Sequence, residues 1–240
     1  MANLRDRERC VARMFGRIAH HYDRLNTIMT LGRHHVWRSL ATEFVCARGM
    51  CGPALDVATG TGDFAIDLAR KEGVSEVVGL DFTHQMLPIA VQKTKRRGHE
   101  GNIQYVLGDA HILPFPDNTF IAATVGFGVR NFVDVPVTIK EIARVLKPGG
   151  RIAILEIVPL ERERMLNRLF VYCFRLLAPW LGMVFASDRE AYTYLPESVR
   201  GFLTAKGLAN LIEEAGFCEV FVRQVALGSV VIMVGEKAAK

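Results

Sequence analysis

Apolar and polar positions form alternating blocks along the chain, and the blocks predict strands and helices in turn. A short apolar run bounded by glycine, proline or polar residues is typical of a buried strand. Five such runs follow one another, at Ala54–Ala58, Glu76–Leu80, Ile103–Leu107, Phe120–Gly126 and Arg151–Val158. Apolar residues recur at helical spacing after residue 63, over Met86–Arg97 and over Ile139–Leu146. Strands that alternate with helices predict a parallel sheet with helices on both faces.

The pattern changes near the C-terminus. A helix is predicted over Leu208–Ala215 and ends at Gly216, a residue that favours a helix stop. Two further strands, Glu219–Val225 and Ser229–Val234, are joined by a loop too short for a crossover helix, so they must pair antiparallel. We therefore predict an α/β, Rossmann-like fold whose seven-stranded sheet has five parallel strands plus a C-terminal antiparallel hairpin. Lys147–Gly150 is expected to form a turn before the fifth strand.

The sequence has no internal repeat and no low-complexity linker, which predicts a single domain over residues 1–240. Within it we expect an N-terminal helical cap or lid over 1–50 and a cofactor-binding core over 51–160. A helical lid or substrate segment is expected over 161–205, and the last helix with the terminal hairpin over 206–240.

One apolar stretch, Met165–Ala186, is long enough to be tested as a membrane span. It contains Arg168, Arg175 and Pro179, each of which is costly in a spanning helix. The two arginines are seven residues apart and lie on one helical face, which favours an amphipathic helix. The stretch is therefore interpreted first as a core-packing or lid helix and second as a surface that contacts a membrane.

Composition and charge limit the classes of protein to which the chain can belong. Hydrophobic residues make up 50% and charged residues 23% of the 240 positions, as in a globular chain with a sizeable core. The net charge of +5 arises within residues 1–50, which hold nine arginines, no lysine and four acids. A basic arm on a neutral body is not the footprint of a protein that binds nucleic acid. It favours an anionic membrane surface or a negatively charged substrate.

The five cysteines include no CxxC pair, which fits neither a zinc site nor a disulfide framework. The protein is therefore expected in a reducing, cytoplasmic compartment and without a metal. The N-terminal residues are rich in charge and lack the apolar region of a secretory signal, which agrees with this location.

A glycine-rich turn after the first predicted strand is the best candidate site. Gly60, Thr61 and Gly62 belong to a GxGxxA sequence, the pattern of dinucleotide-binding folds. The two glycines would let a ligand lie against the backbone. They would equally serve a simple strand-to-helix turn, so the pattern leaves a nicotinamide dinucleotide, S-adenosylmethionine and no ligand as alternatives.

Three aspartates at the carboxyl ends of successive strands separate these alternatives. Asp56 would repel a pyrophosphate but suits the cationic amino and sulfonium groups of S-adenosylmethionine. Asp81 is placed to accept hydrogen bonds from ribose hydroxyls, and Asp109 from the adenine amine. Ligands of open α/β sheets bind at this edge. The carboxylates therefore favour S-adenosylmethionine over a nicotinamide cofactor.

Longer motifs make the chain similar to a known family. Residues 109–117 read DAHILPFPD, residues 127–131 read FGVRN and residues 144–151 read RVLKPGGR. Further matches are MFGRIAHHYDRLN at 14–26, GRHHVWR at 32–38, LDFTHQML at 80–87 and AYTYLPES at 191–198. From Met14 to about Lys237 the chain thus resembles the ubiquinone/menaquinone biosynthesis C-methyltransferases, a family of class I S-adenosylmethionine-dependent enzymes.

The resemblance implies an activity and a set of cofactor contacts. The activity is transfer of a methyl group from S-adenosylmethionine to a ring carbon of a prenylated hydroquinone, such as demethylmenaquinol or a ubiquinone precursor, with S-adenosylhomocysteine as product. The family usually carries serine where this chain has glycine before the FGVRN block. Cofactor contacts are expected, beyond the glycine turn and the aspartates, at Phe82, Met86, Ala110, Gly126 and Phe127.

Arg130 is the first candidate for catalysis, on its position after the fourth strand and on the motif. Its guanidinium cannot act as a simple base at neutral pH, but it would hold the phenolate form of the acceptor, directly or through a water. Asn131 would orient the same oxygen. The alternative is that Arg130 is a solvated loop arginine paired with Asp134.

The N-terminal segment supplies a second candidate cluster. Tyr22 is expected beside the methionine moiety of the cofactor, under a cap that excludes water. His20 or His21 would act as general base, because histidine alone titrates near neutrality when unperturbed. The alternative is that both are surface histidines on a basic helix.

Three other functions stay open. The protein would be a methyltransferase with a different small-molecule acceptor, a non-catalytic relative that keeps the fold, or, in least agreement with its aspartates, a nicotinamide oxidoreductase. The apolar stretch and the basic N-terminus also suggest peripheral contact with the inner face of the membrane, where a lipophilic quinol would reside. A homodimer is compatible with the sequence.

Overall fold

The structure is a computed structural model that describes residues 2–46, 49–160 and 189–239. The apolar stretch Met165–Ala186, with its alternative interpretations as a packed, lid or membrane-contacting helix, lies outside these residues. Within the described ranges, no helix is long and apolar enough to cross a membrane.

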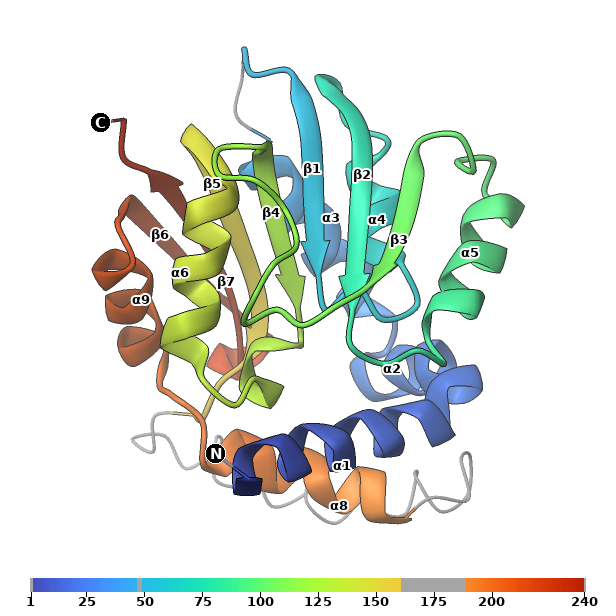
Figure 1. Ribbon diagram of the computed structural model, residues 1–240. Coiled ribbons are helices and arrows are strands. Elements are labelled where there is room, and N and C mark those ends of the chain that lie inside the picture. Colours follow the sequence, from blue (N-terminus) through green and yellow to red (C-terminus); the bar gives the residue numbers. More distant parts are fainter. Residues whose placement is uncertain (1, 47–48, 161–188, 240) are drawn as a thin grey trace.

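One seven-stranded sheet forms the centre of the molecule, in the order β3-β2-β1-β4-β5-β7-β6 (Figure 1). Strands β1 to β5 pair in parallel, and β7 pairs antiparallel with both β5 and β6. The predicted fold class, five parallel strands plus a C-terminal antiparallel hairpin, is confirmed. The strands are β1 (Gly52–Val57), β2 (Val74–Asp81), β3 (Ile103–Leu107), β4 (Phe120–Gly126), β5 (Leu146–Ile157), β6 (Phe217–Val225) and β7 (Val230–Lys237).

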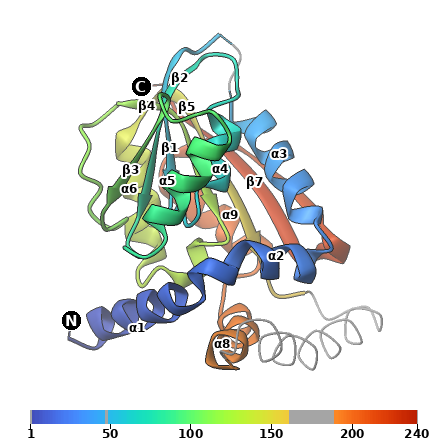
Figure 2. The same ribbon diagram turned by 90° about the vertical axis from the view of Figure 1, so that its right-hand side faces the viewer.

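Helices cover both faces of this sheet (Figures 1 and 2). Successive residues of a strand point to opposite faces, so β1 sends Leu55 into the apolar core under α6 and α9 and Ala54 into the core under α3 and α4. The helices are α1 (Ala2–Ile18), α2 (Tyr22–Thr30), α3 (Arg33–Val45), α4 (Asp63–Leu68), α5 (Leu87–Arg96), α6 (Val135–Val145), α8 (Arg189–Arg200) and α9 (Ala205–Glu214).

The segment Lys147–Gly150, predicted as a turn before the fifth strand, is instead an interruption inside β5. The register of β5 with β4 jumps from Phe120↔Leu146 to Ala122↔Arg151, so four residues bulge out opposite one. The first glycine of the segment has a φ of +75°, which only glycine adopts without strain. The prediction was wrong because β5 pairs with β4 both before and after these four residues, as at a β-bulge.

The N-terminal helices divide into a cap and a core element. α1 and α2 lie over the carboxyl ends of the central strands (Figure 1). α3, which was expected to belong to the cap, packs on the sheet instead and buries Trp37 there. α1 contacts α8 through an apolar cluster of its own, in which Met14, Ile18 and Leu25 meet Tyr194. The pair α1 and α2 is here called the cap.

Candidate functional site

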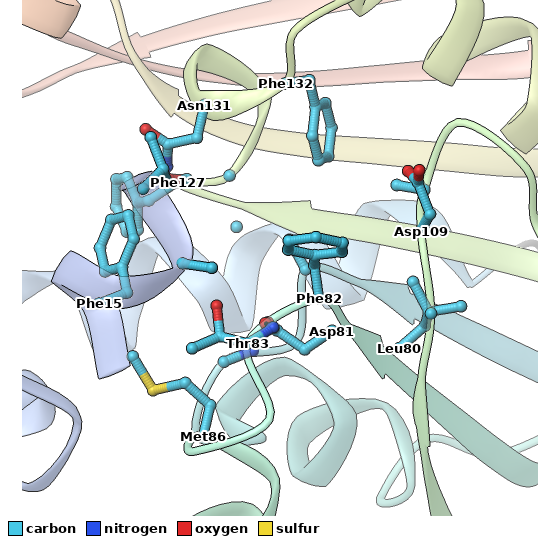
Figure 3. Close-up of a pocket in the computed structure, with 18 of the residues that line it drawn as sticks. Phe15, Leu80, Asp81, Phe82, Thr83, Met86, Asp109, Phe127, Asn131 and Phe132 are labelled. Atoms are coloured by element: carbon cyan, nitrogen blue, oxygen red, sulfur yellow. Dashed lines mark hydrogen bonds between the residues drawn. The ribbon is translucent and has the colours of Figure 1, made fainter. Parts of the chain in front are cut away.

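A pocket opens at the carboxyl ends of β1, β2, β3 and β4, next to helix α1 (Figure 3). The space between its walls, open mouth included, is about 800 Å³. This is also the edge at which open α/β sheets bind ligands. Carboxylates and aromatic rings share the lining, which includes Phe15, Tyr22, Gly60, Asp81, Phe82, Met86, Asp109, Ala110, His111, Gly126, Phe127, Asn131 and Phe132.

Asp81 ends strand β2 and is buried at the floor of the pocket. Its Oδ2 accepts a hydrogen bond of 2.7 Å from the backbone N–H of Gly60, and its Oδ1 accepts one of 2.7 Å from that of Thr83. Burial raises the pKa of Asp81, and these backbone donors act against that rise. Each carboxylate oxygen has a second lone pair, so Asp81 can anchor the glycine turn and still accept from a ligand.

Asp109 follows strand β3, and its side chain is 42% exposed. Its Oδ1 accepts from the backbone N–H of His111 at 2.8 Å and lies 2.7 Å from Nδ1 of the same residue. The other ring nitrogen of His111, Nε2, accepts from the backbone N–H of Asp134 at 3.1 Å. The sequence interpretation gave His111 no role, although its place two residues after a strand-end aspartate was a signal for it.

Asp56, at the end of β1, does not line the pocket. It is buried beneath the glycine turn, where it accepts from the hydroxyls of Thr59 at 2.6 Å and Thr124 at 2.7 Å and from the backbone N–H of Ala65 at 3.1 Å. Burial raises its pKa to about 7. The structure therefore does not support a direct contact between Asp56 and a cationic ligand, because the carboxylate holds the turn to helix α4.

The two glycines of the turn have different neighbours. Gly60 lines the pocket with a φ of +55°, and a side chain there would find its nearest neighbour, a ring carbon of Tyr22, 4.0 Å away. Gly62 faces inward, where a side chain would collide with the hydroxyl of Tyr105. The expected role in admitting a ligand fits Gly60, whereas Gly62 is needed for packing.

Thr61 joins the cap to the glycine turn rather than lining the pocket. Its hydroxyl donates to Asp23 Oδ1 of α2 at 2.5 Å and accepts from Lys93 Nζ of α5 at 2.9 Å. Lys93 also forms ion pairs with Asp23 and, at 3.0 Å, with Asp63. This network fixes α2, whose first residue is Tyr22, against the body of the protein.

Arg130 lies in the short helical turn Val129–Asn131 after β4 and is buried. Its Nη1 donates to Glu156 Oε1 at 2.5 Å and to the carbonyl oxygen of Phe127 at 2.7 Å. The alternative of a surface pair with Asp134 is wrong, because Asp134 instead caps helix α6. Among the described residues, Nε of Arg130 finds no acceptor. A buried N–H is ordinarily paired, and Arg130 does not itself line the pocket.

Tyr22 and Asn131 bring two distant parts of the chain to the pocket. Burial raises the pKa of the Tyr22 phenol, whereas a hydrogen bond with Asn26 and the charge of Arg130 lower it. Asn131 Oδ1 accepts from the hydroxyl of Tyr194 at 3.0 Å. Tyr194 is in α8, so this bond places the AYTYLPES motif beside the FGVRN motif.

A family model places this arrangement among known proteins. The model described as the ubiE/COQ5 methyltransferase family matches residues 1–237. The chain belongs to this family. It is 38% identical over 234 residues to a demethylmenaquinone methyltransferase of Anoxybacillus flavithermus, which covers 96% of this chain and 97% of the relative. It is 40% identical over 227 residues to a demethylmenaquinone methyltransferase of Roseiflexus castenholzii, with coverages of 95% and 93%.

The fold of the methyltransferase also matches solved structures. A crystal structure of a SAM-dependent methyltransferase from Thermotoga maritima superposes with a TM-score of 0.66 at 20% sequence identity, over 94% of this chain and 99% of that one. A likeness at this identity shows the shared fold, and family membership makes the chain an enzyme that uses S-adenosylmethionine.

The pocket of the methyltransferase fits that methyl donor. Buried Asp81 and exposed Asp109 offer acceptors for the hydroxyl and amino donors of adenosine. Phe82 keeps 45% of its surface exposed although it lines the pocket, which leaves a flat face for an aromatic base. Met86 also lines the pocket, and its polarizable sulfur suits contact with an aromatic base.

Gly126 ends β4 and Phe127 directly follows it, and both line the pocket of the methyltransferase. A side chain on Gly126 would lie 2.6 Å from ring carbon Cδ2 of Phe64, so the serine that the resemblance led us to expect does not fit here unless Phe64 moves. Phe127 has a φ of +55°, an uncommon conformation for a residue with a large side chain. The bond from Arg130 to its carbonyl holds it there.

The cap histidines and the apolar part of the lining differ from expectation. His20 and His21 are exposed in the turn Ala19–His21 and do not line the pocket, so the structure supports neither as the general base.

Val11, Phe15 and Phe132 line the pocket but were given no role from the sequence. Phe15 lies in the N-terminal motif and Phe132 directly follows Asn131, so the motifs held this signal.

Proposed function

We propose that the protein transfers the methyl group of S-adenosylmethionine to a ring carbon of a prenylated hydroquinone such as demethylmenaquinol. Relatives at 38% and 40% identity over nearly the whole chain are demethylmenaquinone methyltransferases. The observation that carries the proposal is the division of the pocket (Figure 3). Asp109 lies on one side, Phe15, Phe127 and Asn131 lie on the other, and Phe82 is between them.

The side with the aspartates, here called the adenosine side, suits the donor. Asp81 would accept hydrogen bonds from the ribose hydroxyls and Asp109 from the adenine amine. Phe82 and Met86 would flank the base, and Ala110 leaves room for its edge. In this assignment buried Asp81 binds the ribose and the more exposed Asp109 binds the adenine amine.

The opposite side, here called the acceptor side, suits a hydroquinone. Phe15 and Tyr22 supply apolar ring surface. Arg130 does not line the pocket, so it would act on the acceptor oxygen through a water that accepts from its buried Nε–H, which finds no acceptor among the described residues. A nearby positive charge lowers the pKa of a phenol, which is ordinarily near 10, and so raises the fraction of phenolate. Asn131 would orient the same oxygen.

Charge on the phenolate oxygen is shared with the ortho carbon, which makes that carbon the nucleophile. When bound, S-adenosylmethionine supplies an electrophilic methyl group: the ring carbon forms the new bond, the C–S electron pair stays on sulfur, and the ring hydrogen leaves as a proton. The protein would contribute alignment and the exclusion of water, the latter through the cap formed by α1 and α2.

An assay under anaerobic conditions tests the proposal. The purified protein is incubated with S-adenosylmethionine and a short-chain demethylmenaquinol that is kept reduced, and the product is analysed by mass spectrometry. We expect a product that is heavier by one methylene unit and whose fragments place the methyl group on the ring. A methylated hydroxyl oxygen would instead support another class of acceptor. No product from a protein that binds S-adenosylhomocysteine would overturn the proposed acceptor.

A further inference from the structure

We propose that His111 is a positioning residue that couples the adenosine side of the pocket to the acceptor side. The inference rests on the proposed function, in which Asp109 contacts the adenine and the loop after β4 contacts the hydroquinone. The imidazole has one ring nitrogen for each side. Nδ1 lies 2.7 Å from Asp109 Oδ1, and Nε2 lies 3.1 Å from the backbone nitrogen of Asp134.

The contact with Asp134 constrains the tautomer of the ring. A backbone N–H only donates, so Nε2 of His111 must be the acceptor of the hydrogen bond from Asp134. The single proton of the neutral imidazole is then on Nδ1, where it is donated to Asp109. His111 is thereby an oriented bridge and not a free base.

On the adenosine side, the bridge fixes the carboxylate of Asp109. That side chain is 42% exposed, and the other donor to its Oδ1 among the described residues is the backbone N–H of His111, at 2.8 Å. An exposed carboxylate held by a single bond rotates among several conformations, which costs binding free energy when a ligand orders it. With Oδ1 occupied by the imidazole, Oδ2 is the oxygen presented to an adenine amine.

On the acceptor side, the bridge fixes the loop after β4, which carries Asn131 and Phe132. Asp134 begins helix α6, and its Oδ1 accepts from the backbone N–H of Val137 at 3.1 Å. It ends the loop on which Asn131 and Phe132 reach the pocket. The His111 ring also packs edge-to-face on Phe132, with ring centroids 6.2 Å apart. One side chain therefore positions a donor contact and an acceptor contact.

Two substitutions separate the halves of the bridge. In His111→Asn the amide nitrogen comes near the position of Nδ1, so the bond to Asp109 is kept and the bond from Asp134 is lost. In His111→Gln the amide oxygen comes near the position of Nε2, so the bond from Asp134 is kept and the bond to Asp109 is lost. We expect His111→Gln to weaken S-adenosylhomocysteine binding about tenfold in calorimetry, as for one lost hydrogen bond to a charged group. We expect His111→Asn to keep that affinity and to lose about tenfold in turnover at saturating donor.

Matched controls use His84, which is exposed and does not line the pocket. His84→Asn and His84→Gln should change neither quantity. Binding of S-adenosylhomocysteine and turnover are first measured with the unsubstituted protein. If it does not bind or does not turn over, the proposed function is rejected, and this result is distinct from rejection of the bridge. If both His111 variants lose binding and turnover in the same proportion, or lose only melting temperature, the coupling role is overturned. Weaker binding in His111→Gln alone, together with lower turnover at unchanged affinity in His111→Asn, supports the coupling role.

Discussion

The two sides of the pocket are built in different ways. On the adenosine side, Asp81 ends β2 and Asp109 follows β3, and these two strands are neighbours that pair in parallel. On the acceptor side, Phe15 and Tyr22 come from N-terminal helices and Tyr194 comes from α8, and the three meet in one apolar cluster. Regular sheet geometry thus positions the donor site, whereas the acceptor site depends on the packing of segments far apart in the sequence.

This difference makes the two sides separable by mutation. Variants of the adenosine side should change the affinity for S-adenosylhomocysteine, because the sheet positions the strand ends that carry Asp81 and Asp109 whether or not the acceptor side is intact. Variants of the acceptor side should change turnover or stability and leave that affinity nearly unchanged.

Arg130→Met disrupts the acceptor side and has the largest expected effect. It leaves the fully buried carboxylate of Glu156 without its counter-charge. Removing one partner of a buried ion pair costs about 3–5 kcal/mol, so we expect a loss of that size in the free energy of unfolding, measured by urea denaturation. Arg151→Met is the matched control: Arg151 and Glu236 are 33% and 32% exposed, and their pair should contribute less than about 1 kcal/mol.

The double variant Arg130→Met/Glu156→Leu separates stability from catalysis. Replacing a buried ion pair by apolar side chains is often neutral for stability, so the double variant should regain most of the loss. It should still lack turnover while it binds S-adenosylhomocysteine, because the guanidinium that would hold the acceptor oxygen is gone. Normal turnover in this variant would remove Arg130 from the proposed mechanism.

Asp81→Ala disrupts the adenosine side. It removes the acceptor for the backbone N–H groups of Gly60 and Thr83 and, by our proposal, for the ribose hydroxyls. We expect the affinity for S-adenosylhomocysteine to fall about 100-fold, or about 2.7 kcal/mol, in calorimetric titration. Glu76→Ala, at an exposed position of the same strand, should have no effect. A folded Asp81 variant with unchanged affinity would contradict the assignment of the donor site.

The adenosine side shows how much of a site sequence pattern can predict. Alternating strands and helices bring strand ends to one edge, and Asp81 and Asp109 do line the pocket there. Asp56 ends a strand at the same edge but is covered, because the hydroxyls of Thr59 and Thr124 bind it inside the protein. The pattern states where a strand ends and not which way the following turn folds.

The acceptor side was predictable only through motifs. Tyr22 and Asn131 belong to motifs of the resembled family and line the pocket, but His21, one residue before Tyr22, is exposed. Successive residues of a helix point about 100° apart, so a motif does not determine which of its side chains faces the site. Glu156, the partner of Arg130, is 26 residues away and belongs to none of the motifs. Such a pair follows from tertiary packing, which periodicity does not record.

Gly126→Ser tests the place where the two sides meet, since it introduces the residue that the resemblance led us to expect. Its side chain would lie 2.6 Å from a ring carbon of Phe64. Overpacking of this kind costs about 1–3 kcal/mol, which urea denaturation should detect. Gly101→Ser is the control, because a side chain there meets no atom within 4 Å. The pair Gly126→Ser/Phe64→Leu should recover part of the loss. An unchanged stability of the single variant would show that Phe64 yields without cost.

Lys93→Met should have the smallest effect, because it loosens the connection between the sides without touching either. Lys93 contacts Asp23, next to Tyr22 in the cap, and Thr61 in the glycine turn. Both charges are partly exposed, so their pair should contribute about 0.5–1 kcal/mol, equivalent to a rise of up to about fivefold in KM for S-adenosylmethionine. The rise should shrink at high salt, which screens the ion pair in the unsubstituted protein. Lys95→Met, at an exposed position of the same helix, is the control. If the two variants have equal KM values at low salt, the ion pair does not hold the cap over the donor.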